Sequence, residues 1–349
     1  MAQADCASLA AHSLIFPGMW RSWSRALGAA GGVCALSTQH PRTKCEGKRS
    51  QHPALQSLPG LEGLGLNSQH MSVFTRSGMR ISFAEVLHAA KEADVVLIGE
   101  THDDPVAHQV ELLMLASLEK CSPCALSMEM FESDVQGVVD EYMAGLIDED
   151  DFLKDSRPWV NYLQDYRMLV EFAKEMEMPV IAANMPRRYV RAVGRKGATT
   201  LTQQSWPSSP LAFLGFLMPS PSASYRAHFS ELVHLPTPAT SMGQGCPYIK
   251  QPSEAMSAVL LWDSAMAHSI AKQLSAQPEK RVVHVCGSFH VERYLGIYEM
   301  LSHYRQDTNA VVIAVYPEDD CHEFDQERHG GAADFVVLTD ASLPRSYNP

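Results

Sequence analysis

Residues 94–102 read DVVLIGETH, and residues 281–290 read RVVHVCGSFH. Both stretches end in a Gly-x-x-His tetrad, Gly99 to His102 in the first and Gly287 to His290 in the second. Each tetrad follows an apolar, β-branched run that is typical of a buried parallel strand. Open α/β sheets collect their ligand chemistry at the carboxyl ends of such strands. The two tetrads therefore predict one site that is approached from both halves of a domain.

The rest of the chain alternates between helical and strand patterns from about residue 71 onward. Strands are expected at 94–98, 125–130, 179–183, 281–286, 310–315 and 335–338. Helices are expected at 82–93, 105–120, 134–145, 149–155, 161–178, 187–196 and 253–274, and Ser82 with Glu85 has capping-box spacing at the first of them. This alternation predicts an α/β fold with a largely parallel central sheet flanked by helices. The Ser-, Pro- and Gly-rich segment 198–252 is expected to be a helical or loop insertion, or a lid.

Charge and composition exclude some classes of function. The chain has 349 residues and a net charge of -12, and no basic stripe is present, which argues against nucleic-acid binding. No apolar run approaches the roughly 18–20 residues that span a bilayer, so no transmembrane segment is expected.

Residues 1–65 differ in composition from the α/β domain expected at 66–349. Up to residue 60 the only acidic residues are Asp5 and Glu46, while Arg and Lys are scattered among many Ser, Ala and Gly. This composition is typical of an organelle transit peptide, with a plastid favoured over a mitochondrion. The alternative is a disordered leader.

Polar side chains follow four of the expected strands, so they are expected to converge at one sheet edge. Histidine beside carboxylate suits either proton transfer or metal ligation. For each histidine alone, a hydrogen-bonded side chain without function is the alternative. The candidate site residues are Glu100, His102, Glu129, Asn184, Arg187 and His290.

Two further features lie near this predicted site. Asp263 interrupts the apolar stripe of the helix expected at 253–274, and a carboxylate there is costly unless it is paired. It is expected to orient a site histidine or to pair with Arg187; a purely structural salt bridge or loop cap is the alternative. Tyr162 and Tyr166 follow Trp159 at helical spacing, which by default indicates core packing. A tyrosine near the strand ends could instead ligate ferric haem iron.

Five motifs taken together resemble the ChaN-like haem-binding family of the Tiki/TraB/erythromycin-esterase superfamily. In chain order they are IGETHD at 98–103, SMEMFE at 127–132, AANMPR at 182–187, LWDSAMA at 261–267 and GSFHV at 287–291. The resemblance implies haem as the cofactor, a role in haem or iron handling, and a homodimer. It implies Tyr166 as the iron ligand, with Tyr162 second. From the superfamily's hydrolytic branches it implies metal or base roles for His102, His290 and Glu129, with Glu100 adjacent.

Three functions remain open at this stage. The first is haem binding, with Asn184, Arg187 and Asp263 beside the tyrosines. The second is a hydrolase in which His102 and His290, with or without a divalent metal, activate water while Glu129 or Glu100 moves protons. No Gly-x-Ser-x-Gly elbow is present, which argues against a serine hydrolase. The third is a non-catalytic interaction protein that keeps the scaffold.

Overall fold

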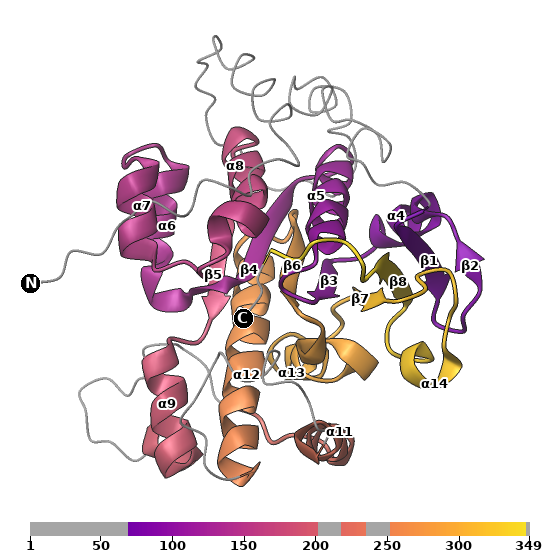
Figure 1. Ribbon diagram of the computed structural model, residues 1–349. Coiled ribbons are helices and arrows are strands. Elements are labelled where there is room, and N and C mark those ends of the chain that lie inside the picture. The colour runs from indigo at the N-terminus through magenta and orange to yellow at the C-terminus, as the bar shows by residue number, and fades with distance from the viewer. Residues whose placement is uncertain (1–68, 202–217, 235–251, 347–349) are drawn as a thin grey trace, which may run out of the picture.

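The computed structural model describes residues 69–201, 218–234 and 252–346 (Figure 1). The leader expected at 1–65 lies outside the described residues, as does most of the insertion expected at 198–252. Within that insertion the structure describes a short 3₁₀ turn, η4 (Ala198–Leu201), and one helix, α11 (Ala223–His234).

In the described part of the chain, eight strands form one sheet in the order β2-β1-β8-β7-β3-β6-β4-β5. All neighbours from β8 to β5 are parallel, whereas β1 pairs antiparallel with both β2 and β8. The predicted fold class, α/β with a largely parallel central sheet, is confirmed. The strands are β1 (Met71–Thr75), β2 (Arg80–Ile81), β3 (Val95–Glu100), β4 (Cys124–Glu132), β5 (Val180–Asn184), β6 (Arg281–Gly287), β7 (Ala310–Glu318) and β8 (Phe335–Asp340).

The antiparallel β1–β2 hairpin was not expected from the sequence. β2 has only two residues, too few to show an alternating pattern. The turn between the strands passes through Gly78, whose φ of +88° favours glycine. The hairpin extends the sheet at the edge opposite to β5, while β3 and β6, which carry the tetrads, lie in its interior.

Helices cover both faces of the sheet (Figure 1). The capping box predicted at Ser82 is present, since its backbone N–H donates to Glu85 Oε2 at 2.7 Å. The predicted helix 161–178 is instead a π-helical turn, η3 (Tyr162–Tyr166), followed by α8. The remaining helices are α4 (Phe83–Ala90), α5 (Pro105–Glu119), α6 (Gln136–Met143), α7 (Glu149–Ser156), α8 (Arg167–Glu175), α9 (Arg187–Lys196), α12 (Pro252–Ala276), α13 (Ile297–Tyr304) and α14 (Gln326–His329).

Alternate residues of the central strands enter two separate apolar cores. Val96 and Ile98 of β3 pack with α4, α5 and α8 on one face. Val95 and Leu97 pack with α12 and α13 on the other face. Burial on both faces explains the continuous apolar run of this strand. No helix among the described residues has the length and apolar character needed to cross a bilayer.

Candidate functional site

The two Gly-x-x-His tetrads lie side by side at the carboxyl ends of β3 and β6. These strands are parallel neighbours, and Glu100 is in register with Gly287. A Cβ on Gly99 would lie 2.5 Å from Val291 Cγ2 and 2.8 Å from Ser288 Cα. A Cβ on Gly287 would lie 2.9 Å from His102 Nε2. Each glycine therefore makes room for the segment that carries the other tetrad.

The first tetrad forms a histidine–carboxylate dyad. His102 Nδ1 lies 3.0 Å from Glu100 Oε1, and the Glu100 side chain is fully buried. The His102 side chain is 32% exposed. Burial alone would lower the pKa of His102, but its hydrogen bond to Glu100 and the charges of Glu100 and Glu129 raise it. Glu100 thus fixes the Nδ1 edge of the His102 ring, while the side chain remains partly exposed to solvent.

The second tetrad forms a matching dyad with α12. His290 Nδ1 lies 2.5 Å from Asp263 Oδ1, and Tyr225 of α11 donates to Asp263 Oδ2 at 2.6 Å. Of the two partners predicted for Asp263, the structure shows a histidine, His290, and not Arg187, which pairs with Glu132. The free-energy cost of burying the Asp263 carboxylate in the apolar stripe is offset by its contacts with His290 and Tyr225.

Glu129 lies between the two histidines. Its Oε2 accepts from the backbone N–H of Gly287 at 2.8 Å, and its Oε1 is 3.6 Å from His290 Nε2. Burial alone would lower the pKa of His290, but the carboxylates of Glu129 and Asp263 outweigh burial and raise that pKa to about 9. His290 is therefore a cation at neutral pH, held between two carboxylates.

The two predicted iron-ligand tyrosines lie in the interior. Tyr166 is fully buried and its hydroxyl donates to Glu100 Oε1 at 2.7 Å. Burial, followed by the charges of Glu100 and Glu111, raises the pKa of this hydroxyl well above its usual value. Tyr162 is 1% exposed and packs against Phe131 and Phe152. In this structure neither tyrosine presents an accessible phenolate.

Asn184 is the last residue of β5 and Arg187 the first residue of α9. The polar contacts described for them are with residues outside the two dyads. Asn184 Oδ1 accepts from the backbone N–H of Met185 at 2.8 Å, which shapes the local turn. Arg187 is half-exposed and forms an ion pair with Glu132. The structure thus brings together Glu100, His102, Glu129, Asp263 and His290, and leaves Asn184 and Arg187 outside this set.

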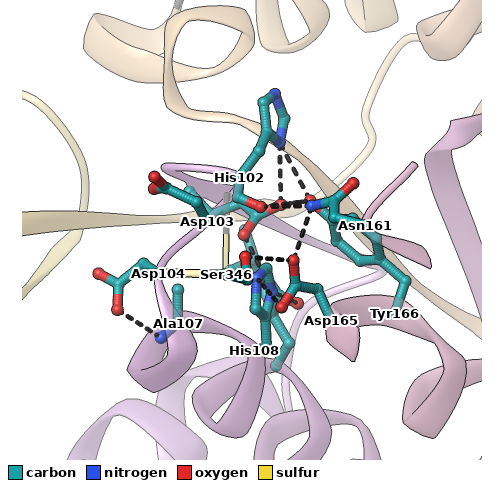
Figure 2. Close-up of polar contacts among 12 residues, drawn as sticks. His102, Asp103, Asp104, Ala107, His108, Asn161, Asp165, Tyr166 and Ser346 are labelled. Carbon is teal, nitrogen blue, oxygen red and sulfur yellow. Dashed lines mark hydrogen bonds and ion pairs between the residues drawn. The ribbon is translucent and has the colours of Figure 1, made fainter. Parts of the chain in front are cut away.

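A polar cluster below His102 was missed by the sequence interpretation. His108 and Glu111 lie three residues apart on α5, and Asp165 belongs to the π-helical turn. Asn161 joins this cluster to the site, since its Nδ2 donates to Asp165 at 2.7 Å and to the His102 carbonyl at 2.8 Å. Figure 2 shows the His102 ring pointing away from this cluster. In the sequence this cluster is marked only by His108 and Glu111, two ionisable residues in a largely apolar helix.

Among the described residues, one group of three has ligand atoms close enough together for a metal ion, and it is Glu100, His108 and Glu111. The trio predicted from the sequence, His102, His290 and Glu129, does not form such a group. Its members lie at the strand ends, where the His102 side chain is partly exposed, and we call this partly exposed region the open site.

Apolar side chains lie beside His102 at the open site. The Trp159 ring meets His102 edge to face, with centroids 4.7 Å apart. The neighbouring side chains of Val160 and Leu163 are 85% and 60% exposed. An exposed apolar edge beside a half-exposed histidine is a suitable surface for an apolar ligand.

These features define an α/β protein with a cluster of histidines and carboxylates at the carboxyl ends of its central parallel strands. The family model described as "Haem-binding uptake, Tiki superfamily, ChaN" matches residues 86–301, and the chain belongs to that family. The predicted resemblance is confirmed. No curated protein sequence matches the chain.

Solved structures resemble the fold. ChaN of Campylobacter jejuni, described as showing cofacial haem binding, has a TM-score of 0.58 at 15% identity, over 78% of this chain and 98% of that one. A mutant of the erythromycin esterase EreC has a TM-score of 0.42 at 12% identity, over 70% of this chain and 77% of that one. The type III effector HopBA1 has a TM-score of 0.39 at 10% identity, over 73% and 91% of the two chains.

Proposed function

We propose that this chain binds haem at the strand-end site, where His102 would hold the iron, in a role in haem or iron handling. Membership of a haem-binding family supports the ligand class. The observation that carries the proposal is that the His102 side chain is 32% exposed at the strand ends, while its Nδ1 is held by Glu100 at 3.0 Å. Bound haem would present its iron to one imidazole.

The surroundings of His102 suit a histidine ligand. Glu100 accepts from Nδ1, which fixes the tautomer and leaves Nε2 as the lone-pair nitrogen. A ligating histidine ordinarily has such a second partner. Val160 and Leu163 offer apolar contact to the macrocycle, and a second copy of the chain would cover the same surface. A homodimer is therefore part of the proposal.

The plastid location remains a prediction from the composition of residues 1–65.

A haemin titration tests the ligand assignment. The full chain is expected to give a saturable Soret band, and His102→Ala is expected to shift or abolish it. Tyr166→Phe is expected to retain the band because its hydroxyl donates to Glu100 inside the core. His303→Ala, at an exposed position on α13, is the matched histidine control. No saturable band, or a spectrum that changes in Tyr166→Phe but not in His102→Ala, would contradict the proposal.

A hydrolase is the second candidate, favoured by the two facing dyads. His102 would take a proton from water, with Glu100 stabilising the imidazolium that forms. The cationic His290, held by Asp263 and Glu129, would stabilise developing negative charge and return a proton to the leaving group. Neither step needs a serine nucleophile.

This candidate predicts a particular pH profile. With p-nitrophenyl acetate as probe, hydrolysis is expected to fall as pH rises through about 9, because His290 then loses its proton. His290→Gln is expected to lower the rate at least about 100-fold, as for loss of a positioned general acid. If the unsubstituted chain and His290→Gln hydrolyse the probe at the same rate at every pH, the site does not hydrolyse this probe.

A further inference from the structure

A second cluster of ionisable side chains is buried on the side of Glu100 that faces away from His102. It consists of Glu100 at the end of β3 and His108 and Glu111 on α5. Their exposed fractions are 2%, 3% and 0%. Neither haem binding nor the hydrolytic scheme uses His108 or Glu111, so the cost of burying them needs another explanation.

The spacing of their ligand atoms matches a coordination shell. His108 Nδ1 lies 3.1 Å from Glu100 Oε2 and 3.4 Å from Glu111 Oε2. One ligand atom from each residue falls within 4.8 Å of the other two. An ion with bonds of about 2.1 Å separates neighbouring ligand atoms by about 3.0–3.4 Å. The two measured separations are those of such a shell.

Two carboxylate oxygens of the cluster have no hydrogen-bond partner. They are Glu100 Oε2 and Glu111 Oε1, both fully buried. Both carboxylates face the same atom of the cluster, since Glu100 Oε2 and Glu111 Oε2 lie 3.1 and 3.4 Å from His108 Nδ1. A divalent cation ligated by the two carboxylates would be balanced by their charges and would give the buried Glu111 Oε1, which accepts no hydrogen bond, a partner.

We propose that Glu100, His108 and Glu111 bind one divalent first-row transition-metal ion beneath the strand-end site. One imidazole nitrogen with carboxylate oxygens, and no thiolate, suits ions such as Zn²⁺ or Mn²⁺. This metal site is distinct from the open site at His102 and His290. It does not depend on the haem proposal.

The far side of His108 is arranged to support this role. Its Nε2 lies 3.7 Å from Asp165 Oδ1, on the ring edge opposite to the two glutamates. Asp165 is in turn held by Asn161 at 2.7 Å and by Ser346 at 2.6 Å (Figure 2). A carboxylate behind a histidine ligand orients the ring and raises its basicity. Asp165 is therefore a positioning residue for the ion.

The ion would also stiffen the open site. Glu100 would ligate it through Oε2, while its Oε1 keeps the hydrogen bonds from His102 and Tyr166. The buried ion would thus fix the carboxylate that orients His102. Its contribution is structural, and bound metal should exchange slowly because all three ligands are inaccessible to solvent.

The test uses the full chain, stripped with a chelator and then titrated with Zn²⁺ or Mn²⁺ in the absence of haemin. We expect one ion per chain by elemental analysis and a higher Tm. Glu111→Gln keeps the side-chain size but removes the charge, and is expected to weaken binding at least about tenfold and to lose the Tm shift. Asp165→Asn is expected to weaken binding about 10- to 100-fold.

His290→Ala is the control for an ion held in the open site, and it should retain both the stoichiometry and the Tm shift. Failure to bind either ion would overturn the proposal. So would equal affinity in Glu111→Gln, or loss of the ion in His290→Ala. The Tm of each metal-free variant shows separately whether it folds. Because the readouts are metal content and Tm, the result stands apart from the haemin titration.

Discussion

Replacing Gly99 with alanine is expected to destabilise the fold by about 1–3 kcal/mol or more and to displace the second tetrad. The new Cβ would lie 2.5 Å from Val291 Cγ2 and 2.8 Å from Ser288 Cα. The second of these atoms is backbone, so a side-chain rotation cannot relieve the contact. The segment that carries His290 must therefore move away from β3, and the two dyads would separate. Urea unfolding measures the loss of stability, and the haemin titration measures the loss of the site.

Gly137 provides the matched control. It is exposed near the start of α6, and a Cβ there would meet nothing within 4 Å. Gly137→Ala is expected to stabilise the protein by about 0.5–1 kcal/mol, because alanine is the better helix former. A Gly99→Ala variant as stable as Gly137→Ala would show that the tetrads are not packed against each other as described.

The sequence predicted the central strands and the adjacency of the two tetrads well, because both depend on local pattern. Continuous apolar runs mark strands buried on both faces, and the carboxyl ends of neighbouring parallel strands must meet at one edge. The structure places Glu100, His102, Glu129 and His290 at one sheet edge, since Glu100 is in register with Gly287 and the Gly287 N–H donates to Glu129. Asp263 was found because a carboxylate in an apolar stripe requires a partner.

Contacts between distant segments were not predictable in the same way. Tyr225, which holds Asp263, comes from the segment that the sequence marked only as a loop-rich insertion. His108 and Glu111 have no strand-end signal, because helical periodicity does not show which polar residues face a carboxylate on another element. The π-helical turn brings Tyr166 to Glu100, and Asn161 just before it donates to the carbonyl of His102, a residue of a distant segment. Local propensity carries no information about such partners.

Glu100 connects these two levels of the structure. One of its oxygens faces His102 and Tyr166, and the other faces His108. Glu100, which the sequence marked as part of the first tetrad, is thus also a member of the buried cluster with His108 and Glu111. A change in the charge of that cluster would reach the open site through a single carboxylate.

Asp263→Ala is expected to cost about 3–5 kcal/mol, because it removes one partner of a buried charged pair. His290 would keep only Glu129, 3.6 Å away, and the Tyr225 hydroxyl would lose its acceptor. Asp263 is one of the two carboxylates that raise the pKa of His290, so that pKa should also fall from about 9. Urea unfolding at neutral pH and a titration of the His290 ring by NMR measure the two effects.

Tyr225→Phe separates the histidine contact from the tyrosine contact of Asp263. It keeps a packed ring on α11 and removes one hydrogen bond to a charged acceptor, so a cost of about 1.5–3 kcal/mol is expected. The pKa of His290 should change much less than in Asp263→Ala, because the carboxylate remains. If the two variants lose equal stability and leave the pKa of His290 unchanged, Asp263 acts as a structural hydrogen-bond acceptor only. A lower pKa of His290 in Asp263→Ala alone would instead show that this carboxylate keeps the second histidine protonated.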